Sequence, residues 1–133
     1  MTKTKVILLI LSAMLLNSCT DKGPVNYKSI AGSWRCEEFS QLLGNRTYMV
    51  EIDRKKNDST LYLLSNFYDV DVEEFIFAQL DGVKLTIQEQ QIGNASVVKS
   101  GTGTVSDNLR RIDLEYRIYD NQREYDVRAV LTR

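Results

Sequence analysis

The feature that most constrains the fold is a strict alternation of apolar and polar residues near the C-terminus. In the run Arg111–Tyr119 every second residue is apolar, and the run after Asp120–Gln122 repeats the pattern. A period of two is typical of β-strands that have one buried and one solvated face. No stretch shows a sustained helical period. The apolar positions are Ile112, Leu114, Tyr116 and Ile118 in the first run and Tyr125, Val127, Ala129 and Leu131 in the second.

Short runs separated by turn residues extend back to the region of Ile30. Asp81-Gly82 is a strong signal for a two-residue hairpin between two of them. Eight strands in about a hundred residues with short turns predict an all-β fold, an eight-stranded antiparallel up-and-down barrel that leaves no exposed sheet edge. A two-sheet sandwich is the alternative. The predicted strands are 33–41, 47–54, 60–65, 75–80, 84–90, 96–105, 111–119 and the run after 122.

The N-terminal residues read as a targeting signal. A short basic region precedes Val6–Leu16, an apolar run of 11 residues, which is shorter than the roughly 20 residues that span a bilayer. The following Leu16-Asn17-Ser18-Cys19 resembles the lipobox of bacterial lipoproteins. We therefore predict a signal peptide over 1–18, a lipidated Cys19 with a tether over 19–28, and a barrel domain over 29–133. Acyl chains such as palmitate on Cys19 would anchor the chain to membrane lipid.

Composition excludes several kinds of chemistry. The chain has no histidine, which removes the usual neutral-pH general base and histidine-containing metal sites. It has two cysteines, so lipidation of Cys19 leaves Cys36 without an intrachain partner, as a buried apolar residue or a free thiol. Removing residues 1–18 takes two lysines and no acid, which moves the net charge from −1 to near −3. We expect no enzyme activity, no cofactor, no metal and no nucleic-acid partner.

The first predicted strand opens with Gly32-Ser33-Trp34, which resembles the Gly-x-Trp signature of lipocalins and their relatives. The span from Ile30 to Arg133 is similar to a group of small lipocalin-like lipoproteins of Bacteroidetes. The matching features are Ile30–Trp34, Asn66-Phe67-Tyr68, Asp81-Gly82 before Leu85-Thr86-Ile87, Gly101-Thr102-Gly103 and the ending Ala129–Arg133. The resemblance implies a calycin-type barrel in which an arginine from a late strand packs across the tryptophan.

The geometry of a closed meander gives an independent expectation for that arginine. The last strand lies antiparallel beside the first, so Trp34 and Arg133 fall at the same end. Arg133 also shares parity with the inward residues of its strand, which predicts that its guanidinium packs on the indole and closes the barrel. Arg128 has the opposite parity and is the second choice.

Parity also predicts which side chains line the interior. An eight-stranded barrel is either filled by side chains or holds one small ligand, and so many large residues favour a packed core. A ligand would enter the mouth opposite Trp34, where we place the binding candidates Glu38, Tyr48, Phe77, Tyr116 and Tyr125; Glu38 is expected to reach solvent at its strand end. The predicted inner residues are Trp34, Cys36, Glu38, Tyr48, Val50, Ile52, Leu61, Leu63, Phe75, Phe77, Leu85, Ile87, Ile112, Leu114, Tyr116 and Tyr125.

Three smaller sequence features have simple interpretations. Asp69–Glu74 holds four carboxylates, but it lacks the glycine and spacing of an EF-hand, so a solvated acidic loop is preferred to a calcium site. Asp58-Ser59-Thr60 resembles the O-glycosylation site of exported Bacteroidetes proteins, with Ser59 as the acceptor. Gly101 and Gly103 share a face and are expected to let their strand bend at a barrel corner.

Two functions follow as hypotheses for a lipoprotein of the cell envelope, anchored in the outer membrane and facing either the periplasm or the surface. The first is non-catalytic binding of a small apolar or amphipathic ligand inside the barrel. The second is a protein-interaction or inhibitor module with a packed core, which acts on an envelope protein through its loops. A continuous cavity would favour the first and a solid core the second.

Overall fold

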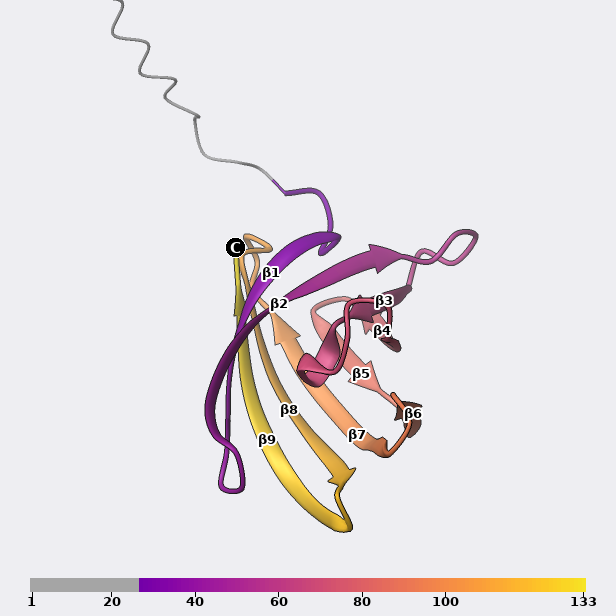
Figure 1. The fold of residues 1–133 in the computed structure, drawn as a ribbon. Coiled ribbons are helices and arrows are strands. Elements are labelled where there is room, and N and C mark those ends of the chain that lie inside the picture. The colour runs from indigo at the N-terminus through magenta and orange to yellow at the C-terminus, as the bar shows by residue number, and fades with distance from the viewer. Residues whose placement is uncertain (1–26) are drawn as a thin grey trace, which may run out of the picture.

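A computed structural model describes residues 27–133, which form one closed antiparallel sheet of nine strands (Figure 1). Consecutive strands pair with each other except β5 and β6, which both pair with β7, and β9 returns to pair with β1. The predicted all-β up-and-down barrel is confirmed, and the ring closure excludes the sandwich. The strands are β1 Gly32–Ser40, β2 Gly44–Arg54, β3 Leu61–Ser65, β4 Phe75–Asp81, β5 Lys84–Ile87, β6 Gln90–Ile92, β7 Ser96–Val105, β8 Arg111–Asp120 and β9 Arg123–Thr132.

Two of the nine strands share one position in the ring, so the barrel has eight positions. β5 pairs with the second half of β7 and β6 pairs with its first half, on either side of a break at Gln88. Opposite the break, the β7–β8 register shifts between Val98 and Ser100. A β-bulge of this kind bends a strand and changes which residues face inward. The sequence predicts a single strand over 84–90, and the structure divides it.

The glycines of β7 are needed where strands lie close together. A Cβ on Gly101 would lie 3.0–3.1 Å from side-chain atoms of Ile87 and Tyr116. A Cβ on Gly103 would lie 3.1 Å from the main-chain oxygen of Asp113. Both glycines face the interior, as their shared parity predicts. Their lack of a side chain allows β5 and β8 to approach β7.

The two ends of the barrel are built differently. The start of β1 and the C-terminus lie together at one end, which we call the closed end (Figure 1). The β1–β2 hairpin and the β8–β9 turn lie at the other end, which we call the mouth (Figure 1). β2 pairs with β3 only through Glu51–Arg54, so at the mouth the first half of β2 pairs with β1 but has no strand on its other side. A short 3-10 turn, η1 (Phe67–Asp69), lies beside it instead.

Large side chains fill the barrel interior, as the sequence predicts. The core contains residues from every strand, together with Ile30 before β1 and two aromatic residues of η1. Close packing of this kind supplies most of the stabilisation of a small domain through burial of apolar surface. The largest fully buried side chains are Trp34, Phe67, Ile30, Ile52, Leu64, Ile76, Leu85, Ile87, Ile92, Ile112, Ile118 and Leu131.

The predicted parity of β3 and β4 is wrong. Phe77, predicted as a ligand-binding residue of the interior, lies on the outer face and is 38 % exposed, and Phe75 lies beside it. The inner residues of β4 are Ile76 and Ala78. Both strands carry apolar residues on both faces, so their sequence contains no alternation that fixes the inward side. For the same reason Tyr62 and Leu64, rather than Leu61 and Leu63, face the core of β3.

The predicted signal peptide over 1–18, the lipidated Cys19 and most of the tether lie outside the described residues. Among residues 27–133 there is no helix with the length and apolarity needed to cross a membrane.

Candidate functional site

The closed end is held by Arg133, as the parity of β9 predicts. Its guanidinium lies 4.2 Å from the centre of the Trp34 ring and 3.7 Å from that of Tyr27, so one cation is enclosed between two aromatic rings. The Trp34 indole donates a hydrogen bond of 2.8 Å to the carbonyl oxygen of Ile30. Cation–π contacts of this kind contribute on the order of 0.5–2 kcal/mol each.

Main-chain oxygens accept the hydrogen bonds of the Arg133 side chain. Nε donates to Leu109 at 2.8 Å, Nη1 to Ala31 at 2.8 Å and Nη2 to Ser29 at 2.6 Å. Partial burial lowers the pKa of Arg133, in part offset by Tyr27. These contacts join the segment before β1 to the β7–β8 loop. Arg133 therefore has a structural role, which is to hold the closed end together.

The mouth contains a buried carboxylate. Glu38 on β1 is only 5 % exposed, and its Oε2 accepts hydrogen bonds of 2.7 Å from the hydroxyls of both Tyr48 and Tyr116. Its Oε1 accepts from Arg46, whose Nε lies 2.8 Å away, and Arg46 and Glu38 are cross-strand partners in the β1–β2 register. The expectation that Glu38 reaches solvent is therefore wrong: a buried ion needs partners, and three side chains supply them.

Burial and the carboxylate together change the acid–base behaviour of this cluster. Burial first, and the negative charge of Glu38 in addition, raise the pKa of the Tyr48 and Tyr116 hydroxyls. Burial would lower the pKa of Arg46, but the attraction of Glu38 outweighs it and the pKa is raised. Burial also raises the pKa of the neighbouring Cys36 thiol to about 12, so Cys36 is held as a neutral, buried thiol.

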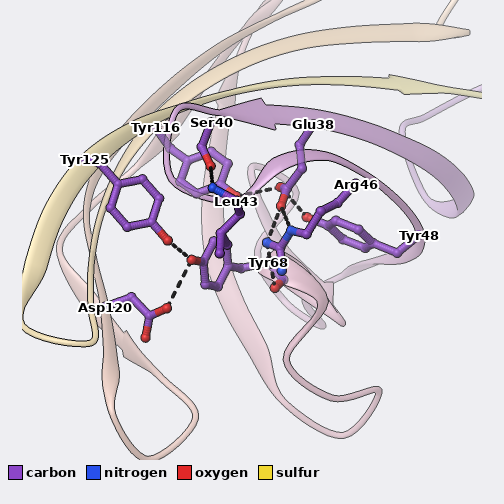
Figure 2. Close-up of polar contacts among 9 residues, drawn as sticks. All are labelled: Glu38, Ser40, Leu43, Arg46, Tyr48, Tyr68, Tyr116, Asp120 and Tyr125. Atoms are coloured by element: carbon purple, nitrogen blue, oxygen red, sulfur yellow. Dashed lines mark hydrogen bonds and ion pairs between the residues drawn. The ribbon is translucent and has the colours of Figure 1, made fainter.

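The segment Asn66–Val70, which contains η1, covers this cluster, and we call it the mouth plug. The Phe67 ring lies 4.7 Å from that of Tyr116. The Tyr68 hydroxyl bonds to the Tyr125 hydroxyl and lies 3.1 Å from Oδ2 of Asp120. Both plug rings are buried. Figure 2 shows Tyr68 between Arg46 on one side and Tyr125 and Asp120 on the other.

Arg46 joins the plug to the buried carboxylate. Its guanidinium lies 4.4 Å from the centre of the Tyr68 ring, and Nη2 donates a 3.2 Å hydrogen bond to the carbonyl oxygen of Tyr68. The Arg46 side chain is 25 % exposed, so it lies at the boundary between the interior and solvent. The side-chain amide of Asn66 donates a 2.8 Å hydrogen bond to the carbonyl oxygen of Met49 on β2.

Four of the five predicted binding residues come together at the mouth: Glu38, Tyr48, Tyr116 and Tyr125. Phe77 does not, because it lies on the outer face of β4. Sequence reasoning missed Arg46, Tyr68 and Asp120. Arg46 could have been found, because it has the same parity as Tyr48 on its own strand.

The remaining predicted sites lie on the surface. Ser59 is exposed in the β2–β3 loop. The side chains of the predicted acidic loop from Asp69 to Glu74 are exposed, and the loop is partly ordered by its own Asp71, which accepts from the Glu73 amide at 2.8 Å. Within residues 27–133 no three histidine, cysteine or acidic side chains are grouped to hold a metal ion.

The protein is thus an antiparallel barrel with eight strand positions. Arg133 holds one end closed, and the mouth plug covers the other. No family model matches the chain, and no curated protein matches it significantly.

Proposed function

We propose that this protein is an envelope-anchored, non-catalytic binding protein, whose lipocalin-like barrel takes a small apolar or amphipathic ligand at the mouth opposite Trp34. The observation that carries the proposal is the convergence of polar side chains from β1, β2, β8 and β9 inside the mouth, under a loop rather than a strand. Pockets that bind small molecules typically combine apolar walls with a few convergent polar groups.

The packed interior restricts where such a ligand can lie. Below the mouth cluster, the core is filled by the Trp34, Ile52 and Ile112 side chains among others. A ligand that entered deeply would have to displace close-packed residues, at a large free-energy cost. The volume occupied by Phe67 and Tyr68 is different, because these residues belong to a loop whose movement breaks no strand pairing.

The tether would orient this site. The described chain begins at Tyr27, which packs on Arg133 at the closed end. A lipid anchor on Cys19 would therefore hold the closed end toward the membrane, and the mouth would face away from it. The ligand would then arrive from the aqueous side of the envelope.

The proposal is tested by native mass spectrometry of the full lipoprotein purified from its own host. A reproducible extra mass that is lost on denaturation is the expected result. Arg46→Gln should lose the adduct because it removes the guanidinium at the mouth, whereas Arg128→Gln, on the outer face, should keep it. A native mass equal to the bare lipoprotein, repeated after incubation with host extracts, would contradict ligand binding.

A second candidate is a protein-interaction module that acts through its loops. It is favoured by the filled core together with three exposed apolar residues at the β1–β2 hairpin: Phe39, Leu42 and Leu43. Exposed apolar groups at a loop are typical of contact surfaces. If this alternative holds, changing these three residues to serine should abolish capture of an envelope partner. If the first proposal holds, the same change should leave the small-molecule adduct unchanged.

A further inference from the structure

We propose that Phe67 and Tyr68 occupy the mouth as a built-in ligand mimic, and that the ligand displacing them is a neutral phenol that also carries a carbonyl oxygen. The inference rests on the proposed binding function and deepens it by naming the chemical class of the ligand. It is drawn from what the plug presents to the barrel.

Three contacts of the plug with fixed parts of the barrel define what a replacing ligand must offer. The Phe67 ring packs on Tyr116, which requires an apolar or aromatic body. The Tyr68 hydroxyl meets the Asp120 carboxylate and the Tyr125 hydroxyl, which requires a hydroxyl donor at that end.

The third contact is the carbonyl oxygen of Tyr68, which accepts from Arg46. If the plug moved out without replacement, Arg46 would lose this acceptor and Asp120 would lose the Tyr68 hydroxyl. A ligand that restores both bonds and covers Tyr116 would therefore replace the plug most fully. Those requirements together describe a phenol or related hydroxylated ring with a carbonyl oxygen at the opposite end.

The charges at the mouth favour a neutral ligand. Among the residues named at the mouth, Arg46 carries the one positive charge, and the Glu38 carboxylate is already ion-paired with it. Asp120 adds a further carboxylate, whose Oδ1 accepts a 2.7 Å hydrogen bond from the Ser96 hydroxyl. A ligand carboxylate at the Asp120 end would face a like charge without a cation to offset it, which disfavours anionic ligands.

The backbone of the plug is strained, which makes its displacement less costly. Asn66, Tyr68 and Asp69 have φ angles of 58°, 59° and 56°, in the left-handed region. Asn and Asp tolerate this region, but a bulky aromatic residue such as Tyr68 does so rarely. Strain at such a residue persists only where surrounding contacts enforce it, and it concentrates at binding sites and switches.

The plug lies on a loop whose two ends are joined by a main-chain hydrogen bond. The Asn66 amide donates to the carbonyl oxygen of Glu74 at 3.0 Å, which closes the base of a nine-residue loop between β3 and β4. Compact loops with adjacent ends are often functional. The loop tip is solvent-exposed, with Val72 74 % exposed. Outward rotation about this base exposes the mouth and leaves every strand pair of the barrel intact.

The test measures binding of 4-hydroxybenzylideneacetone, a neutral phenol with a carbonyl oxygen, to the full lipoprotein in nanodiscs. The double variant Phe67→Ala/Tyr68→Ala removes both rings and the hydroxyl of the mimic and leaves its main-chain carbonyl. Val72→Ala is the matched control at the tip of the same loop. Because a closed plug reduces the apparent affinity by the fraction of open molecules, the double variant should bind at least about tenfold more tightly than wild type. The control should bind as wild type does.

Analogues test the chemical class in the same double variant. Benzylideneacetone lacks the hydroxyl and should bind at least about tenfold more weakly. The 4-carboxy analogue should bind weakly too, and Asp120→Asn should restore part of its affinity. Where the double variant loses its fold, as judged by circular dichroism, the single variant Phe67→Ala replaces it and should still bind more tightly than wild type.

Equal affinity of the wild type and the folded plug variant, or binding that ignores the hydroxyl, would overturn the mimic. When either of these binding results is obtained but native mass spectrometry still finds a host molecule on the protein, the mimic is rejected and the proposed binding function stands. If no host molecule is found either, both fail together. Tighter, hydroxyl-dependent binding by the plug variant supports the mimic in either case.

Discussion

Both ends of the barrel are held by an arginine stacked on aromatic rings, but the two arginines have different partners. Arg133 is enclosed by Trp34 and Tyr27 and bonds to carbonyl oxygens of the main chain. Arg46 pairs with the buried carboxylate of Glu38 and stacks on Tyr68, whose backbone is strained.

The comparison teaches how one barrel can have a permanent end and an end that opens. At the closed end, the carbonyl oxygens that accept from Arg133 belong to main chain next to β1 and β8. Moving Arg133 away from them would break hydrogen bonds without relieving any backbone strain. At the mouth, the carboxylate keeps Arg46 in place even when Tyr68 leaves. The barrel side of the site therefore stays organised, and only the plug has to move.

The largest effect is expected where the mouth loses its charge partner. Glu38→Ala leaves Arg46 without its ion pair and two buried tyrosine hydroxyls without an acceptor, so the free energy of unfolding should fall by about 3 to 4 kcal/mol. Urea unfolding followed by tryptophan fluorescence measures it. Glu37→Ala, one residue away on the outer face, should change stability by less than about 0.5 kcal/mol. Equal effects of the two substitutions would refute the buried network.

Removing the closed-end arginine should have the next largest effect. Arg133→Ala loses two stacking contacts and three hydrogen bonds, so the free energy of unfolding should fall by about 2 kcal/mol. Arg128→Ala is the control, because its side chain is 81 % exposed and makes one surface ion pair. The same urea experiment compares the two variants. An Arg133 variant as stable as the Arg128 variant would show that the Arg133 contacts at the closed end do not stabilise the barrel.

Alkaline pH should weaken the core between the two ends. Burial raises the pKa of the Cys36 thiol from its ordinary value of 9.0 in the unfolded chain to about 12 in the folded one. A pKa raised on folding contributes stability that is complete below pH 9 and is lost as the pH rises toward 12. The slope from this thiol should reach about 1.4 kcal/mol per pH unit. Unfolding at pH 8 to 11 should show a steeper loss for wild type than for Cys36→Ala; parallel curves would argue against a neutral buried thiol.

The smallest expected effect isolates the outermost contact of the plug. Tyr68→Phe keeps both plug rings and removes the hydroxyl that meets Asp120 and Tyr125. Thermal unfolding should show a loss of about 1 kcal/mol. Tyr119→Phe, at an exposed position of β8, is expected to be neutral. A loss as large as that of Glu38→Ala would mean that the plug, rather than the carboxylate, holds the mouth together.

Much of the barrel could be predicted because four of its long strands alternate. In β1, β2, β8 and β9 one face is mostly apolar, so parity places Trp34, Tyr48 and Tyr116 inside and Arg133 beside Trp34. β3 and β4 carry apolar residues on both faces, and there the inward side is decided by neighbouring strands. Phe77 was misplaced for that reason.

The candidate site was predicted in part. Glu38 and the tyrosines follow from parity, but the depth at which Glu38 lies depends on Arg46, which reaches it across the β1–β2 hairpin. The plug does not follow from the alternation pattern, because a single 3-10 turn with left-handed Asn66 and Tyr68 is stabilised by tertiary contacts. The resemblance includes Asn66-Phe67-Tyr68 but gives these residues no place in the barrel. The available signal is an adjacent aromatic pair, Phe67-Tyr68, at the start of an acidic loop.

The difference between the two ends is tested most directly by native-state hydrogen exchange. The amides of Asp69 and Val70, which are bonded within the plug, should exchange through an opening at least about 2 kcal/mol less costly than global unfolding. The Trp34 indole N–H, bonded to Ile30 at the closed end, should exchange only when the whole barrel unfolds. If these groups exchange with the same free energy, the mouth is as permanent as the closed end and the account is contradicted.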